Sequence, residues 1–413
     1  MQRDARLFEF KPEEFIVEEI LEDGTVLEAG RQFSREDSPG KFCHFVLQKK
    51  GWNTAQALDA VAKCLRVSRK RLDCAGTKDR NAVTVQLCSA FAVEPRRLLG
   101  VKIRDVSING AWKACDKVRM GSLLGNRFTV TLNFENCGQW PDAARIQERL
   151  RETKSCFPNY FGDQRFGSLR RNTHEVGKLL LQGRMEEAVM NFLAFTDESE
   201  EGAGREARQR LAEHKDFSNA LSYFPPYLKY ERAIIAHLSV YPKDFVGALR
   251  KLPRTTLLMF VHAFQSRLFN EMLRKRVSEG PLEARKGDFW CEADEHGFPF
   301  LKGEGAVKQV KSKAEAGKLQ KKLDEKKAFL AANIVGSESK LNAEEKELLS
   351  EHGITQESFA VKSIPEISSK GSFRSLTAPI KDFKVLEFSP VKIRFALQSG
   401  AYATEALKHL LAV

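Results

Sequence analysis

Residues 75–86 read AGTKDRNAVTVQ and stand between two segments with the character of β-strands. Before them, Arg71 to Cys74 forms a short run that can end a strand. After them, apolar and polar side chains alternate, which predicts a half-buried strand: Val83, Val85 and Leu87 alternate with Thr84, Gln86 and Cys88. The stretch therefore predicts a tight connection between two strands, with Asp79 inside it.

Asp79 is the candidate for chemistry in this connection. An ionised carboxylate in a cleft can act as a base or a nucleophile when nearby cations keep its pKa low, and Lys78 and Arg80 supply such charge. The alternative is structural, because aspartates in tight turns commonly bond to their own backbone. The residues from Gly76 to Lys78 lack the G-x-x-x-x-G-K-[ST] spacing of a phosphate-binding loop, so we reject a nucleoside triphosphatase.

Length and composition indicate a globular protein with room for two domains. The chain has 413 residues, of which 42% are hydrophobic and 30% charged. It has no run of about 18 apolar residues and no apolar segment behind a basic N-terminus, so we expect no membrane span, no signal peptide and a cytoplasmic location. Eight cysteines without a C-x-x-C pair, and histidines without metal-binding spacing, predict reduced thiols and no metal.

The basic charge of the chain points to an anionic partner. The formal net charge is +12 and the pI is about 9.2, and the commonest partner of such a protein is nucleic acid, bound through its phosphates. A solvated basic surface without this role is the alternative. Residues 302–327 hold nine lysines against four acidic residues, a local net charge of 9 − 4 = +5. This run is either a solvated helix face or an arm that contacts an RNA backbone.

Residues 1–135 read mainly as strands with a single helix. Thr54 is the expected cap of this helix, in which apolar residues recur at helical spacing up to Leu65. The strands are expected where apolar and polar residues alternate, within 8–21, 43–48, 101–108 and 128–134.

From about Pro141 the chain reads as mostly helical up to residue 278, residues 287–301 are a further strand candidate, and the chain returns to strand near its end. Helices are expected over 142–154 and over most of 173–278, the longest from 254 to 277, and residues 391–397 alternate again before a short C-terminal helix. Strands at both ends with helices between them predict one α+β domain interrupted by a helical insertion. Two consecutive domains are the alternative.

Two further segments could contact a nucleotide. Asn126 and Phe128 lie two apart at the start of a strand and so share a face, where an amide can bond the edge of a base and a ring can stack on it. The alternative places Phe128 in the core. Residues 160–167 combine aromatics and glycines with Gln164 and Arg165, which suits either close approach to phosphate or a hinge between domains.

These segments together resemble the TruD family of pseudouridine synthases. AGTKDRNAVTVQ resembles the signature loop of that family, whose catalytic aspartate corresponds to Asp79. Further motifs resemble those of the family over most of the chain, and weakest over 280–365: PEEFIVEE at 12–19, GNRF at 125–128, NYFGDQRFG at 159–167, FQSRLFN at 264–270 and SGAYATEAL at 399–407. The family often carries a lysine shortly before the opening proline; here Glu9 stands at about that place, and Lys11 is the nearest lysine.

The resemblance implies a pseudouridine-synthase core, which is a mixed and mainly antiparallel sheet with flanking helices, interrupted by a helix-rich domain particular to the family. We place the catalytic domain at 1–165 and 371–413 and the insertion, which would contact RNA, at 166–370. The implied activity is isomerisation of uridine 13, in the D arm of transfer RNA, to pseudouridine.

The resemblance also implies the roles of single residues. The reaction needs an ionised carboxylate, which would be Asp79, and no redox cofactor, nucleotide or metal. The uridine must leave its stack, at a cost of roughly a few kcal/mol, and a stacked ring recovers on the order of 1–3 kcal/mol of it. The candidates for substrate binding are Phe128, Asn126, Lys78, Arg80, Lys11, Gln164 and Arg165.

Two other classes of function remain open from the residues alone. A non-catalytic RNA-binding or RNA-chaperone protein could keep the same fold, although a carboxylate among phosphates has little use in a binder. A small-molecule lyase or hydrolase is disfavoured by the basic charge and by the lack of an evident acid–base pair.

Overall fold

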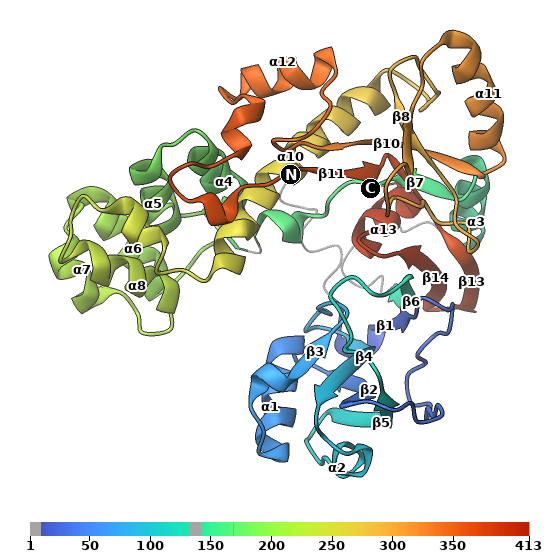
Figure 1. Cartoon of the computed structure of the whole chain (residues 1–413), viewed down its shortest axis with the longest axis horizontal. Helices are drawn as coiled ribbons and strands as arrows, with labels where there is room; N and C mark the ends of the chain where they lie inside the picture. Colours follow the sequence, from blue (N-terminus) through green and yellow to red (C-terminus); the bar gives the residue numbers. More distant parts are fainter. Residues whose placement is uncertain (1–9, 133–141, 168, 413) are drawn as a thin grey trace. The chain divides into compact units, whose positions relative to one another are not determined.

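The computed structural model describes residues 10–132, 142–167 and 169–412 (Figure 1). The chain forms two compact units. The first comprises Met1–Phe157 together with Ala378–Val413, and the second comprises Pro158–Thr377. The short strands β7 (Cys156–Pro158) and β12 (Thr377–Pro379) lie where the chain passes from one unit to the other.

An eight-stranded sheet forms the centre of the first unit. Its order is β13-β14-β6-β1-β4-β2-β5, with β3 beside β4. The pair β1–β4 is parallel, and the other pairs of this sheet are antiparallel. The strands are β1 (Phe15–Ile20), β2 (Phe42–Lys50), β3 (Leu72–Cys74), β4 (Val83–Phe91), β5 (Val106–Ala114), β6 (Gly125–Leu132), β13 (Lys381–Phe388) and β14 (Val391–Gln398). The predicted α+β fold with a mixed, mainly antiparallel sheet is confirmed.

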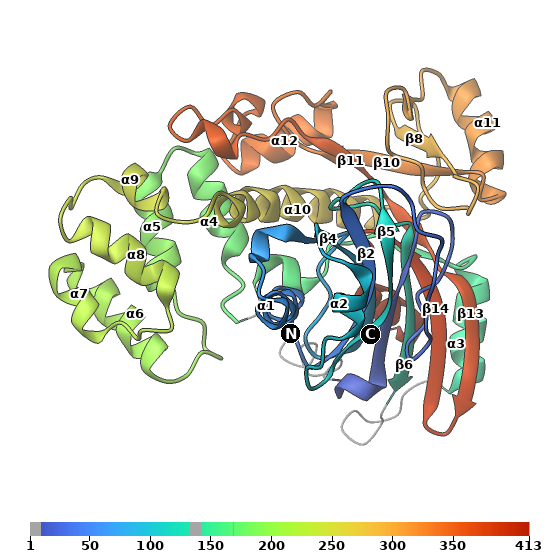
Figure 2. The ribbon, with the colours of Figure 1, turned by 60° about the horizontal axis from the view of Figure 1, so that its bottom comes forward.

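The end of the chain completes this sheet. Strand β14 pairs along its whole length with β6, and Figure 2 shows β13 and β14 running beside β6. Apolar side chains at every second position of β14 are buried with those of β6 and β1, and β14 lies between β6 and the edge strand β13.

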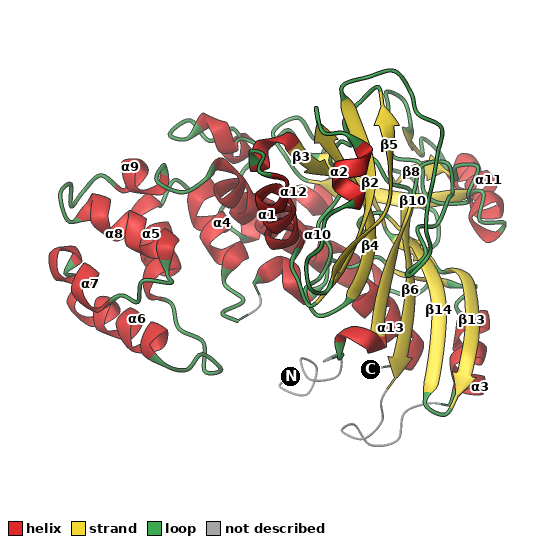
Figure 3. Ribbon diagram, turned by 90° about the horizontal axis from the view of Figure 1, so that it is seen from below, coloured by secondary structure: helices red, strands yellow, loops and turns green. Residues whose placement is uncertain are grey.

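The two faces of the sheet are covered differently. On one face, α1 (Thr54–Leu65) packs on β2, β4 and β5, while α3 (Ala143–Glu152) and α13 (Ala403–Leu411) pack on β1, β6 and β14 (Figure 3). On the other face, residues around Leu27 pack on Val46, Val85 and Trp112. The short α2 (Pro95–Leu99) contributes Leu98 to the core under α1.

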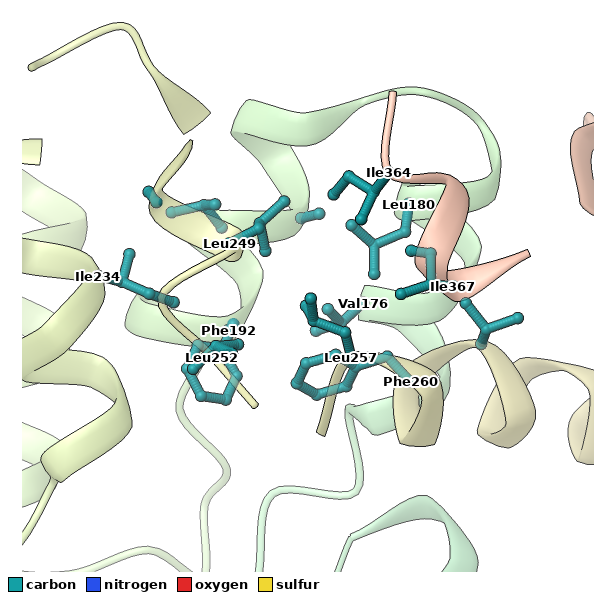
Figure 4. Close-up of a cluster of buried hydrophobic side chains, with 14 of the residues drawn as sticks. Val176, Leu180, Phe192, Ile234, Leu249, Leu252, Leu257, Phe260, Ile364 and Ile367 are labelled. Atoms are coloured by element: carbon teal, nitrogen blue, oxygen red, sulfur yellow. The ribbon is translucent and has the colours of Figure 1, made fainter. Parts of the chain in front are cut away.

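The second unit combines a helical part with a small sheet of order β11-β10-β8-β9. The long helix α10 carries buried apolar residues at the predicted spacing, and Figure 4 shows Phe260 and Leu257 of this helix among side chains of α4 and α5. The elements are α4 (Thr173–Leu181), α5 (Met185–Ala194), α6 (Ala203–His214), α7 (Phe217–Tyr223), α8 (Lys229–Leu238), α9 (Phe245–Leu249), α10 (Arg254–Ser278), β8 (Phe289–Glu292), β9 (Val307–Gln309), α11 (Lys313–Asp324), β10 (Ala328–Ile334), α12 (Ala343–Glu351) and β11 (Ser372–Ser375).

One glycine allows α4 to lie close to α10. A Cβ atom at Gly177 would stand 2.0 Å from the carbonyl oxygen of Phe260, so a larger residue would force the two helices apart. Among the described residues, no helix is long and apolar enough to cross a membrane.

Three expectations about single elements need correction. The cap of α1 is Asn53, whose side chain accepts a hydrogen bond from the Gln56 N–H (2.8 Å), and Thr54 is the first residue of the helix. Strand β5 begins at Val106, because Asp105 has a φ of 59°, which ends the extended backbone. Strand β4 is buried on both faces instead of one, because both faces of the sheet are covered.

The boundaries of the compact units differ from the predicted domain boundaries at 165 and 371. Residues 158–165 belong to the second unit, where the Asn270 side chain bonds the Phe161 backbone. Residues 371–377 belong there too, because β11 pairs with β10. The predicted strand residue Phe134 lies outside the described residues.

Candidate active site

The loop that carries Asp79 connects β3 to β4, and its backbone is held by buried polar side chains. The Lys49 ammonium on β2 donates to the carbonyl oxygens of Asp79 (2.7 Å) and Lys78 (3.3 Å). The Lys78 N–H donates to Oγ1 of Thr54 (2.9 Å), the first residue of α1. Gln86 on β4 donates to the Gly76 carbonyl (2.9 Å). Three separate elements therefore fix the path of this loop.

The strand register aligns Lys49 with a row of side chains across one face of the sheet. Lys49 pairs with Thr84, Thr84 with Val17, Val17 with Phe128, and Phe128 with Phe395. Paired residues in neighbouring strands point to the same face, so these five side chains form one row across the sheet. Lys49 stands at one end of this largely apolar row, where its ammonium donates to the carbonyl oxygens of the loop.

Lys78 turns into the protein and pairs with Glu19 of β1. Its ammonium lies 2.7 Å from the Glu19 carboxylate, and the two side chains are 5% and 0% exposed. The second Glu19 oxygen accepts the Leu87 N–H at 3.0 Å. Buried charges need such partners, since removing either one leaves an uncompensated ion. The pair therefore fastens the loop to the sheet, and a substrate contact of Lys78 stays a prediction.

Asp79 and Arg80 lie on the exposed side of the same loop. The buried Lys49 ammonium donates to the Asp79 carbonyl oxygen and so fixes the position of the exposed Asp79. Burial lowers the pKa of Lys49 to about 8, and the negative charge of Asp79 opposes that shift. Arg80 donates from Nε to the Gly51 carbonyl at 3.4 Å. The arrangement presents an aspartate to solvent on a rigid support.

Asn126 and Phe128 share a face of β6, as predicted, and differ in their surroundings. Oδ1 of Asn126 is buried and accepts no hydrogen bond from the part of the chain that the structure describes, and Asn126 is paired with Glu19 in the sheet. Phe128 is 6% exposed and stacks on Phe395 with a centroid distance of 5.6 Å. Phe128 thus lies in the core, and its stacking on a base stays a prediction.

The remaining candidates lie away from this loop in the sequence. Lys11 is exposed at the start of a short 3₁₀ turn, where its N–H donates to Glu14 (2.9 Å). Gln164 and Arg165 belong to the second unit, where Arg165 donates from Nε to Ser266 of α10 (3.0 Å). The structure brings Lys78, Asp79, Arg80 and the Asn126 strand together in the first unit, and it places Gln164 and Arg165 in the other.

Four residues that hold the loop were missed by the sequence reasoning: Glu19, Lys49, Thr54 and Gln86. One signal was available, because Phe45, Leu47 and Lys49 alternate on the inward face of a strand, and a buried lysine requires a partner. Glu19 stood in the quoted opening motif without a role. In the described ranges no group of three or more His, Cys, Asp or Glu side chains could hold a metal.

Comparisons with known proteins agree over almost the whole chain. The family model for tRNA pseudouridine synthase D (TruD) matches residues 8–410. A Methanosarcina barkeri protein named "Probable tRNA pseudouridine synthase D" is 34% identical over 97% of this chain and 92% of its own length. An Archaeoglobus fulgidus protein of the same name is 34% identical over 97% and 93%. A structure titled "Crystal Structure of the Putative tRNA pseudouridine synthase D (TruD) from Methanosarcina mazei" superposes with a TM-score of 0.74 at 30% identity, covering 98% of this chain and 92% of that one.

Proposed function

The chain belongs to the tRNA pseudouridine synthase D (TruD) family, and we propose that it converts uridine 13 of transfer RNA to pseudouridine with Asp79 as the catalytic carboxylate. The resemblance predicted from the motifs is confirmed, and the family is one of isomerases. The position of the target uridine in the D arm and the role of Asp79 are the parts that we propose.

One observation carries the proposal. Asp79 is exposed, yet its carbonyl oxygen accepts a hydrogen bond from the fully buried Lys49 at 2.7 Å, and the preceding residue, Lys78, is held by its buried ion pair with Glu19. A surface turn with only a structural role has no need of a buried cation beneath it. A reactive group gains from such support, because small displacements of a catalytic group reduce its rate strongly.

The chemistry requires one charged carboxylate and a rotated base. The bond between C1′ and N1 of the uridine breaks, the uracil turns, and a bond forms between C1′ and C5. C5 gives up its proton and N1 ends with one, so the product is an isomer of the substrate. Asp79 could attack the sugar, attack the base or take a proton from the ribose, and each of these roles needs its ionised form.

Neighbouring groups can hold the uridine that is turned out of the RNA. The buried Oδ1 of Asn126 lacks a donor among the described residues, and a uracil N–H is a donor of suitable type. Phe128, two residues further on, is the candidate for stacking. We propose Lys11, Arg80, Gln164 and Arg165 as contacts to the RNA, and the exposed lysines of α11 as contacts to its phosphates.

The substitution Asp79→Asn tests the catalytic role. It keeps the size of the side chain and removes the charge, so we expect turnover to fall on the order of a thousandfold or more while RNA affinity stays nearly unchanged. The measurement is pseudouridine mapping in unmodified transfer RNA, with RNA binding followed in parallel.

Asp116→Asn is the matched control, because Asp116 is another exposed aspartate of the first unit. We expect this variant to keep wild-type turnover. Pseudouridine formation at the wild-type rate by the Asp79 variant would refute the catalytic assignment. RNA binding by the wild-type protein with no pseudouridine at any position would instead favour the non-catalytic RNA-binding alternative.

A further inference from the structure

A cavity lies in the first unit, on the sheet face opposite the Asp79 loop. Its volume is about 320 Å³, and Leu27, Phe33, Trp112 and three arginines contribute to its lining. Strand β1 relates the two faces: Glu19 points to Lys78 of the loop, while Glu18 points to Arg127 of the cavity, 2.7 Å away. Nothing in the proposed reaction uses this cavity.

The floor of the cavity is apolar and firmly placed. Leu27 and Trp112 are 1% and 6% exposed and pack together in the core of that face. The chain from Leu27 to Phe33 is pinned to the sheet at both ends, because the Leu27 N–H donates to the Glu19 carbonyl (2.9 Å) and the Phe33 N–H donates to the Asn109 carbonyl (2.7 Å). The cavity is therefore preformed, as small-molecule sites usually are.

Guanidinium groups lie over both aromatic rings of the lining. The Arg31 guanidinium is 5.7 Å from the centre of the Phe33 ring, and that of Arg35 is 5.9 Å from the centre of the Trp112 ring. Such pairs offer flat surfaces on which a further planar group can stack. The same guanidinium groups carry N–H donors in the fork that matches a phosphate.

The three arginines are held with different strength. The Arg127 side chain is 15% exposed and pairs with Glu18 (2.7 Å) and Glu28 (3.1 Å), so it forms a fixed side of the cavity. Arg31 and Arg35 pair with Glu28 (3.2 Å) and Asp23 (2.7 Å) at exposed positions. Exposed pairs contribute little free energy, so these two cations can exchange their carboxylates for a phosphate at small cost.

We propose that this cavity binds one ribonucleotide of an unpaired strand of the RNA substrate, with its phosphate on Arg31 and Arg35 and its base against the stacked guanidinium and aromatic groups. The volume lies at the lower end of the range of small-molecule sites and suits a single nucleotide. The inference rests on the proposed function for its choice of RNA. Binding of a nucleoside monophosphate to the cavity can be tested whether or not the proposed function is correct.

The test compares two double variants of the full-length protein. Arg31→Gln/Arg35→Gln removes the two exchangeable cations, and Lys102→Gln/Arg104→Gln removes the same charge from another exposed part of the first unit. Calorimetry measures binding of uridine monophosphate and of an unpaired hexauridylate. We expect the Arg31/Arg35 variant to bind both ligands about tenfold more weakly than the control variant, since charge-assisted hydrogen bonds are lost.

Two further measurements locate the site and identify its natural ligand. Photo-crosslinking of a hexanucleotide that contains 4-thiouridine should give adducts within residues 25–35 or at Trp112, and the KM for transfer RNA should rise in the Arg31/Arg35 variant with kcat unchanged. Equal nucleotide binding by both double variants, or adducts only elsewhere, would overturn the cavity as a nucleotide site.

The outcomes also separate the inference from the proposed function. Weaker uridine monophosphate binding with an unchanged KM for transfer RNA would restrict the cavity to free nucleotides and overturn its RNA role. A wild-type protein that forms no pseudouridine would refute the proposed function. Hexauridylate binding and the crosslinks would still show whether the cavity binds a nucleotide.

Discussion

The two faces of the central sheet hold their charges in different ways. On the face of the Asp79 loop, Lys49, Lys78 and Glu19 are buried and each is bonded to a partner. The opposite face also holds a largely buried pair, Arg127 with Glu18, but there Arg31 and Arg35 lie in exposed pairs around a cavity. Buried charges are costly to move and so fix the geometry of a neighbour, whereas exposed charges can change partners. The first arrangement suits catalysis, and the second suits binding.

The largest expected effect comes from breaking the buried pair. Glu19→Gln keeps the shape of the side chain but leaves the Lys78 ammonium without a counter-charge, so the free energy of unfolding should fall by about 3–5 kcal/mol. Urea unfolding measures the change. The double variant Glu19→Gln/Lys78→Met should recover much of the loss, because it removes both charges.

Glu28→Gln is the matched control on the other face. Glu28 is partly exposed, and its partner Arg127 keeps Glu18, so the free energy of unfolding should change by less than about 1 kcal/mol. Losses of equal size for the Glu19 and Glu28 variants would contradict the distinction between the two faces.

The next effect concerns turnover. Lys49→Met preserves the length of the side chain and removes the donor to the Asp79 and Lys78 carbonyls, so the loop should lose its fixed position. We expect kcat to fall by about ten- to a hundredfold, with a much smaller change in KM for transfer RNA. Single-turnover kinetics separates the two quantities.

A Lys50→Met variant serves as control for this change, since Lys50 is the next residue of β2 and pairs with Glu13 at the surface. Its turnover should match that of the wild-type protein. If Lys49→Met raises KM and leaves kcat unchanged, then Lys49 contributes to RNA binding and does not position Asp79.

The smallest expected effect is a dependence of stability on pH. Burial lowers the pKa of Lys49 to about 8 from the usual 10.5, so between these values the unfolded chain binds more protons than the folded one. The contribution of Lys49 to stability should therefore increase as pH rises from about 8 to 10.5, by at most about 1.4 kcal/mol for each pH unit.

Unfolding experiments at pH 7.5 and pH 9.5 on the wild-type protein and on Lys49→Met provide the comparison. The wild-type protein should gain stability relative to the variant at the higher pH. A relative loss at pH 9.5 would mean that the ammonium is stabilised by its surroundings instead of penalised by burial.

Much of the fold could be predicted from the sequence because its signals are local. The alternation after Ala82 predicted β4, and the spacing of Leu257, Phe260 and Phe264 predicted α10. The predictions were wrong where contacts between distant parts of the chain determine the burial of a strand or the limits of a unit. The burial of β4 on both faces depends on a segment near Leu27 that reads as a loop by itself. The unit boundaries depend on β11 pairing with β10.

The candidate site could be predicted only as a position along the chain. From the residues alone, Asp79 could be placed in a short connection between two strands, with a cation on each side. Which of these two cations turns inward depends on contacts with residues far away in the chain. Lys78 lies 59 positions from Glu19, and the parallel pairing of β1 with β4 brings them to 2.7 Å. In a buried, weakly polar environment the attraction between Lys78 and Glu19 outweighs the hydration that the lysine loses. Asp79 then lies on the exposed side of the loop.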